Sequence, residues 1–243
     1  MKKLLMAGVA AIGLTLSANV ANAAVSYTTA ANNNVLGAGF EGWLGATWYL
    51  LAGSNTTIDV YKVGIEAGAN NSFTLGTTTY GPYSGNDGLT ELLGGTVPVQ
   101  QLASEVIAPG LVPFQFDTSF GGGTVTNGAN PLPLVTPNFL SAVFNCPPGA
   151  ITGCTFTGGS LASSGNTLLL ALDDGGGGRV PDDNHDDLVM IIRISNGSFT
   201  GVPEPATLGL LGAGLLGLGF AARRRRKARL SRNAVGKRYT PTA

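Results

Sequence analysis

The chain has 243 residues, and its 14 basic and 14 acidic residues give a formal net charge of zero. The charges are segregated, because residues 24–205 hold three basic residues against all 14 acidic ones, a net charge of −11. So acidic a segment argues against a nucleic-acid-binding protein. The single histidine, His185, excludes HExxH metalloproteases and zinc sites built from three histidines, and the sequence has neither a G-x-S-x-G elbow nor a P-loop.

The N-terminus has the pattern of a secretory signal peptide. Two lysines precede an apolar core over residues 4–16, and small residues at positions 21 and 23 mark a cleavage site. Gly8 and Gly13 interrupt the core, which is too short for an uncleaved anchor. We predict a signal peptide over residues 1–23 that signal peptidase removes after Ala23.

Residues 24–201 have the pattern of an all-β domain, with short apolar runs between turns rich in Gly, Asn and Ser. The last run, LVMIIRI, has almost no polar alternation and predicts a strand that is covered on both faces, as in a two-sheet sandwich. We expect a single jelly-roll-like β-sandwich over residues 24–201. The best strand candidates are Thr47–Leu51, Thr57–Ile65, Leu111–Phe116, Phe139–Phe144, Thr167–Leu172 and Leu188–Ile194.

One window of the domain departs from the β pattern. Its apolar residues fall on one face of a helix, and Thr96 and Pro98 supply a cap and a first-turn proline. The window therefore predicts a short surface helix. The residues on the apolar face are Val99, Leu102, Ala103, Val106 and Ile107.

The two cysteines, Cys146 and Cys154, flank a turn-prone loop of seven residues. In an exported protein this arrangement predicts a local disulfide that pins a loop. A structural zinc site is a weaker alternative, because two cysteines and one histidine leave it short of ligands. A Cys-His nucleophile pair with His185 would need reduced cysteines.

The densest group of acidic residues surrounds a glycine-rich loop in the stretch LDDGGGGRVPDDNHDDL. Asp182, Asn184 and Asp186 have the D-x-N-x-D spacing with which a calcium loop opens, and hard cations take such oxygen ligands. An EF-hand is excluded, because Asp187 and Arg193 stand where Gly and Glu are required. Two interpretations stay open: these side chains cap turns, or they bind calcium. The calcium ligands would be Asp182, Asn184 and Asp186, with help from Asp173 and Asp174.

The C-terminal region combines an apolar run with a block of arginines. Residues 206–222 are uncharged and mostly apolar, and as a helix they would extend for about 25 Å, close to the thickness of a hydrocarbon core. Basic residues follow this run, and basic residues next to a membrane span stay on the cytoplasmic side of the membrane. The pattern therefore predicts a transmembrane helix over residues 206–222 and a cytoplasmic tail over residues 230–243. The G-x-G-x-x-G inside the run lacks the preceding strand of a dinucleotide site. The basic block comprises Arg223, Arg224, Arg225, Arg226, Lys227 and Arg229.

Residues 202–229 resemble the PEP-CTERM sorting signal of exopolysaccharide-producing Gram-negative bacteria. Pro203, Glu204 and Pro205 come first, then the apolar run, then the arginines, in the order that such signals have. The resemblance implies export through the inner membrane and recognition by exosortase, a membrane protease, with processing near the Pro-Glu-Pro element. One departure is that the chain continues beyond the arginines to Ala243.

A second resemblance concerns the exported domain. The blocks VGIEAGANNSF, LVPFQF and DDNHDDLV look like those of a group of uncharacterised exported PEP-CTERM proteins. The resemblance implies a shared architecture and no known activity. It also groups Glu66 and Asn71 of the first block with the acidic loop, and we expect one of them to approach that loop.

Together these features predict an exported, surface-directed protein that is a structural or binding component of the extracellular polysaccharide matrix, with exopolysaccharide as a partner and no cofactor other than calcium. The alternative is a secreted carbohydrate-active enzyme that uses paired carboxylates, with Glu66, Glu91 and Glu105 as the residues to inspect. Two acids converging in a deep groove lined by Trp43 or Trp48 would favour the enzyme.

Overall fold

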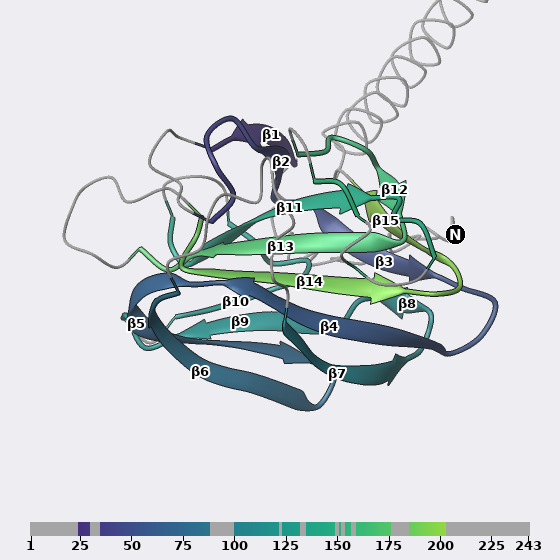
Figure 1. The fold of residues 1–243 in the computed structure, drawn as a ribbon, viewed down its shortest axis with the longest axis horizontal. Helices are drawn as coiled ribbons and strands as arrows, with labels where there is room; N and C mark the ends of the chain where they lie inside the picture. Colours follow the sequence, from purple (N-terminus) through teal and green to yellow (C-terminus); the bar gives the residue numbers. More distant parts are fainter. Residues whose placement is uncertain are drawn as a thin grey trace, which may run out of the picture.

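The computed structural model describes most of the predicted exported domain. The described residues are 24–29, 35–87, 100–121, 123–131, 135–148, 151, 154–156, 159–175 and 185–202. They form fifteen strands in three antiparallel sheets, which confirms the all-β prediction (Figure 1).

The largest sheet has seven strands, and its centre is made of the most apolar segments of the chain. Two of these segments, β13 and β14, form a hairpin that lies side by side with β11 on one side and β4 on the other (Figure 1). The strand order is β1 (Val25–Thr28), β2 (Glu41–Leu44), β11 (Asn138–Phe144), β13 (Thr167–Asp173), β14 (Leu188–Ile194), β4 (Thr56–Gly64) and β7 (Gln100–Ile107).

Two four-stranded sheets complete the fold. The first has the order β10 (Thr124–Thr126), β9 (Phe114–Thr118), β5 (Glu66–Leu75) and β6 (Thr78–Asn86). The second has the order β12 (Ser164–Gly165), β15 (Ser198–Val202), β3 (Thr47–Leu51) and β8 (Gly110–Leu111). In Figure 1, β9 and β10 lie behind β4 and β14 of the large sheet.

The main core lies between the large sheet and the two smaller ones, so the fold is sandwich-like. Alternate residues of β13 point to opposite faces: Leu168 and Leu170 join the main core, whereas Leu169 packs into a second cluster on the other face. The smaller sheets contribute apolar side chains such as Phe73 and Trp48 to the main core. Segments outside the strands, including Val35 to Phe40, cover the second cluster.

The run Leu188–Ile194 is β14, and every residue in it is buried, as the lack of polar alternation predicted. Thr47–Leu51 is also found as predicted, β11 and β13 differ from their predicted bounds by one residue at one end, and β4 differs by one residue at each end. The predicted strand Leu111–Phe116 is wrong as a single element: β8 ends at Leu111 and β9 begins at Phe114. Pro113 lies in the interruption, where it has no N–H to give to a ladder.

The predicted surface helix is wrong. From Gln100 to Ile107 the chain is β7, which pairs with β4. Val106 is 67% exposed while Ile107 is buried, so neighbours that a helix would have placed on one apolar face point to opposite sides. The hydrogen bonds of the ladder with β4 outweigh the local pattern, because an eight-residue helix is marginal on its own. Thr96, Pro98 and Val99 lie outside the described residues.

Three asparagine side chains act as strand partners where no strand is available. Each accepts a hydrogen bond from the backbone N–H of one residue and donates one to the C=O of that same residue. Asn127 does so with Trp48 at 2.9 and 2.7 Å, and Asn130 does so with Phe139 at 2.9 and 2.6 Å. Asn166 pairs in the same way with Cys146 at 2.8 Å in both bonds. Buried backbone groups are thereby satisfied at the margins of the sheets.

Candidate functional site

A buried polar cluster lies where the hairpin of β13 and β14 meets β5 and the start of β11. The hairpin contributes acidic residues that flank the glycine-rich loop, and each of them has a relative exposure of 3% or less. A glycine-rich connection between two fully buried strands thus brings carboxylates to one end of the core. The described acidic residues of the cluster are Asp173, Asp174, Asp186 and Asp187.

Asn71 of β5 connects this hairpin to the neighbouring sheet. Its Nδ2 donates to Oδ2 of Asp174 at 2.7 Å and to the backbone O of Asp187 at 3.3 Å. The Asp174 backbone N–H in turn donates to Oδ2 of Asp187 at 2.7 Å. Asn71 is fully buried, and within the part of the chain that the structure describes its Oδ1 has no hydrogen-bond partner.

Asn138, the first residue of β11, joins the cluster to His185. Its Nδ2 donates to Oδ2 of Asp173 and to the backbone O of Val135, both at 3.3 Å. These two acceptors orient the amide, so Oδ1 of Asn138 accepts from Nε2 of His185 at 2.7 Å. His185 is buried, has a positive φ of 55°, and packs against the ring of Tyr27 at a centroid distance of 5.0 Å.

The predicted calcium ligands are only partly described by the structure. Asp182 and Asn184 lie outside the described residues, whereas Asp173, Asp174 and Asp186 belong to the buried cluster. Among the described residues, no group of three or more His, Cys, Asp or Glu side chains is arranged to hold a metal ion. Calcium binding therefore stays a prediction.

The residue pair that connects the first sequence block to the acidic loop is also present. Asn71 contacts Asp174, and the backbone N–H of Glu66 donates to the backbone O of Asp186 at 2.9 Å. Asn138 is not among the predicted site residues. An asparagine that precedes a strand is most simply read as a turn residue, and no local signal distinguishes it from one.

The residues of the enzyme alternative are dispersed. Glu105 accepts a hydrogen bond from the Tyr80 hydroxyl at 2.9 Å, Glu66 lies at the cluster, and Glu91 is outside the described residues. Trp48 is fully buried, and its Nε1 donates to Oγ of Ser141 at 2.9 Å. Trp43 is half-buried, and the space that Trp43 and Trp48 line together has a volume of about 10 Å³, which is far smaller than a groove for a sugar ring.

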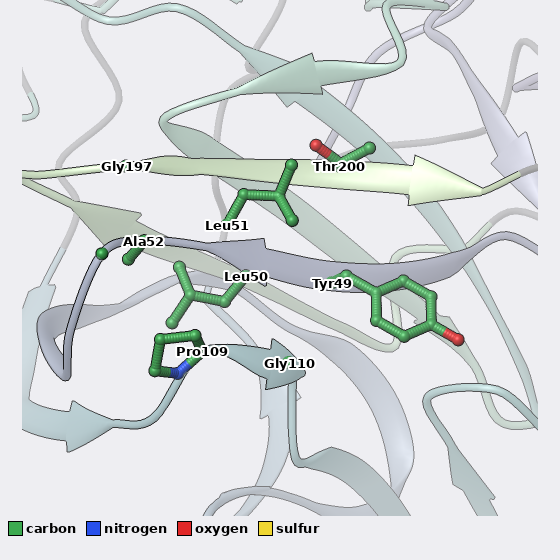
Figure 2. A pocket seen from close by; sticks show the side chains of 9 residues that line it. Tyr49, Leu50, Leu51, Ala52, Pro109, Gly110, Gly197 and Thr200 are labelled. Atoms are coloured by element: carbon green, nitrogen blue, oxygen red, sulfur yellow. The ribbon is translucent and has the colours of Figure 1, made fainter.

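Two adjoining hollows lie at the turns that end β3 and begin β15. The larger, of about 790 Å³, is shallow and mostly apolar, with Tyr49, Leu51 and Pro109 in its lining (Figure 2). The smaller, of about 310 Å³, is lined by polar residues such as Ser54, Asn55 and Asn196. Both linings include Ala52, Gly53 and Gly197, and neither contains an acidic or basic residue.

The structure joins Cys146 and Cys154 by a disulfide across eight residues. The loop is held at its start by the pairing of Asn166 with Cys146, and Ile151 inside the loop and Phe156 just after it belong to the second cluster. Arg193 of β14 donates through its guanidinium to the backbone O of Pro147. The disulfide therefore belongs to the scaffold of the large sheet.

The predicted sorting residues lie outside the described part of the chain. Ala23, Pro203, Glu204 and Pro205, the arginines from Arg223 to Arg226 and the predicted transmembrane helix 206–222 all belong to this group. The described residues contain no helix that is long and apolar enough to span a bilayer. The last described strand, β15, ends at Val202, immediately before the Pro-Glu-Pro element.

Comparison with protein families identifies the C-terminal segment. The PEP-CTERM protein-sorting motif matches residues 201–226, which span the end of β15, the Pro-Glu-Pro element, the apolar run and the arginines. Comparisons with curated proteins and with solved structures find no match to the chain. The motif indicates an exported protein with a membrane-anchored sorting signal that exosortase processes. The chain therefore carries a PEP-CTERM protein-sorting motif at its C-terminal end.

Proposed function

We propose that the mature protein is a structural or binding component of the extracellular polysaccharide matrix, delivered there by the exosortase pathway. The observation that carries the proposal is the continuity between domain and signal: the PEP-CTERM motif begins at Gly201, inside the last strand of the β-domain. Removal of the signal near Pro203–Pro205 would leave β15 intact. The domain would then be released with its three sheets complete.

The proposal divides the chain into four segments. Residues 1–23 are a signal peptide that signal peptidase removes after Ala23, and residues 24–201 are one jelly-roll-like sandwich. Residues 202–229 are the sorting signal, with a transmembrane helix over 206–222, and residues 230–243 are a cytoplasmic tail. The abrupt change from an acidic domain to a basic C-terminus supports this orientation.

The described surface supports a binding or structural role. The two hollows at the ends of β3 and β15 have uncharged linings of apolar and hydroxyl- or amide-bearing side chains, which match the CH faces and hydroxyls of a neutral saccharide. The proposal assigns no catalytic role to the carboxylates, because the Glu105 carboxylate accepts from the Tyr80 hydroxyl, whereas Glu66 lies beside Asp186, to which its backbone N–H donates.

The experiment compares the protein in an exosortase-bearing host with the same host lacking exosortase. We expect the released protein to begin at Ala24 and to end near Pro205, as measured by intact mass, and to fractionate with the exopolysaccharide. Without exosortase the basic segment should be retained in the membrane fraction. A matched variant, Glu204→Gln with Pro203→Ala, should behave in the first host as the parent does in the second. Released protein that still carries Arg223 to Arg226 would contradict the processing step.

A further inference from the structure

The outer face of the sheet that contains β15 is apolar although it is exposed. Along β3, Trp48 and Leu50 point into the main core, whereas Tyr49 is half-buried and Leu51 is 55% exposed. Figure 2 shows Leu50 and Leu51 on opposite sides of β3. Leu111 of β8 lies directly opposite Tyr49 in the register and is 49% exposed. We define the outer face by Tyr49, Leu51 and Leu111 with Ser198 and Thr200 of β15.

This face is uncharged within a domain that is strongly acidic. Residues 24–205 carry a net charge of −11, yet the lining of the hollow on this face includes no acidic or basic side chain. Within the part of the chain that the structure describes, the Tyr49 hydroxyl makes no hydrogen bond, so it is available to an outside acceptor. A tyrosine beside exposed leucines is a composition that suits the boundary between lipid and water.

The chain itself determines how far this face can be from a bilayer. Val202 is the last residue of β15, and the apolar run begins at Ala206. The four residue steps between them allow at most about 14 Å of extended chain. Thr200, which pairs with Tyr49, lies two residues before Val202, about 7 Å along the strand. While the run is in the membrane, the sheet of β15 is therefore held next to the lipid surface.

We propose that, in the anchored precursor, the outer face rests on the bilayer and Leu51 and Leu111 enter the headgroup region. The inference depends on the membrane anchor of the proposed function. Two apolar side chains and an amphipathic ring gain by burial at the interface, and no carboxylate of the lining has to be desolvated. The contact fixes the orientation of the domain and holds the chain that leaves β15 beside the membrane, where the membrane protease acts.

The test uses the full chain in phosphatidylcholine nanodiscs. Cysteine is introduced at one position at a time and labelled with an environment-sensitive fluorophore, while the native cysteines are protected by their disulfide. The discs contain lipids with or without a nitroxide quencher on the acyl chain. We expect a label at Leu51→Cys to lose emission with quencher lipids. A label at Phe120→Cys should keep its emission, because Phe120 is 51% exposed but lies beyond the far end of β9 from Leu111.

A second pair of variants removes the contribution of the label itself. The fluorophore is placed at Ser198→Cys, opposite Leu51 on the outer face, and the native apolar residues are then changed. Leu51→Asp with Leu111→Asp should abolish the quenching at position 198. The matched change Phe120→Asp, also at an exposed apolar residue, should leave it unchanged. All four positions are away from the core, so thermal unfolding should stay cooperative in both backgrounds.

The outcomes separate this inference from the proposed function. Equal quenching at positions 51 and 120 in chains that enter the discs would overturn the outer-face contact and leave the anchor standing. If the emission of the label at position 198 changes only when a disc holds two copies of the chain, the contact with the bilayer would be overturned in favour of self-association. A change in the emission of that label on addition of neutral polysaccharide, with no change in quencher lipids, would overturn the contact with the bilayer in favour of a saccharide site. A chain that does not enter the discs would contradict both the anchor and the contact.

Discussion

Asn127 completes the hydrogen bonding of Trp48 as a neighbouring strand would, although 79 residues separate the two in the sequence. Its Oδ1 accepts from the Trp48 N–H at 2.9 Å, and its Nδ2 donates to the Trp48 C=O at 2.7 Å and to the Val112 C=O at 2.8 Å. Trp48 is fully buried between the large sheet and the sheet of β3. One turn side chain thus stabilises the point at which β3 meets β8.

Replacement of Asn127 should be costly for this reason. Asn127→Ala would leave the Trp48 N–H buried without its partner, at about 1–3 kcal/mol, whereas the C=O groups of Val112 and Trp48 still accept from the backbone N–H groups of Phe114 and Val112. We expect the free energy of unfolding, measured by chemical denaturation, to fall by about 1–3 kcal/mol. Asn55→Ala is the matched control, because Asn55 is exposed. Similar small losses for both variants would show that water replaces Asn127 at no cost.

Asn71 supports a second prediction, which concerns pH. Asn71→Asp would place a carboxyl group against Asp174 in a fully buried site, where burial and the like charge raise its pKa. A raised pKa in the folded state favours the protonated form, so the variant should be least stable at neutral and higher pH. As the pH falls through the raised pKa, its deficit relative to the parent should shrink. Asn71→Ala introduces no new carboxyl group and should show a smaller deficit than Asn71→Asp at neutral and higher pH.

The measurement is the midpoint of thermal unfolding of the parent and the two Asn71 variants over a range of pH. The loss of the hydrogen bond to a carboxylate should cost Asn71→Ala about 1.5–3 kcal/mol. A deficit of Asn71→Asp that stays constant as the solution is acidified would indicate that the introduced group reaches water. The cluster would then be less closed than its burial indicates.

The sequence predicts the centre of this fold better than its margins. Runs such as Leu188–Ile194 are apolar without alternation because both faces of the central strands are buried, and this signal is local. The hairpin of β5 and β6 carries Asn and Thr at many positions, so its strand character depends on partners that lie far away in the sequence. For β7 the local pattern favoured a helix, and pairing with β4 decided otherwise.

The polar cluster illustrates the same limit at the site. The acidic loop is evident from the sequence, because six aspartates flank a run of glycines. Its partners are not evident, since Asn71 lies 103 residues before Asp174 and Asn138 lies 47 residues before His185. Only the register of β5 and β11 against the rest of the fold brings these amides to the carboxylates.

Tyr80 should determine part of the alkaline stability of the domain. Its hydroxyl donates to Glu105 at 2.9 Å, and burial, followed by the hydrogen bond and charge of Glu105, raises its pKa above the ordinary value of 10.0. The folded chain therefore keeps this proton more tightly than the unfolded chain. The stabilisation is fully present below pH 10.0 and is lost as the pH rises toward the higher folded pKa.

Tyr80→Phe removes this group while keeping the ring that stacks on Phe73. At neutral pH the variant should lose about 1.5–3 kcal/mol of the free energy of unfolding, the usual range for one hydrogen bond to a charged group. The difference from the parent should narrow in alkaline solution. Burial also raises the pKa values of Tyr61 and Tyr83. Both tyrosines are present in the parent and in the variant, so their contributions to the pH dependence of stability cancel in the comparison. A difference that is the same at neutral and alkaline pH would contradict this role.

Calcium binding by the acidic loop is the last prediction. Asp182, Asn184 and Asp186 are the proposed ligands, with Asp173 or Asp174 beside them, and the buried Oδ1 of Asn71 is an oxygen of the type that calcium takes. A cation would reduce the repulsion between neighbouring carboxylates. Binding to the folded state alone should stabilise it by about 2.7 kcal/mol at a hundredfold excess over the Kd.

The measurement is thermal unfolding of the detergent-solubilised chain with calcium and with chelator, at one ionic strength so that screening is constant. Asp182→Ala with Asp186→Ala should remove the shift in midpoint, whereas Asp59→Ala with Asp117→Ala, which removes the same charge from other strands, should keep it. Equal midpoints in calcium and chelator for the parent would favour the turn-capping interpretation.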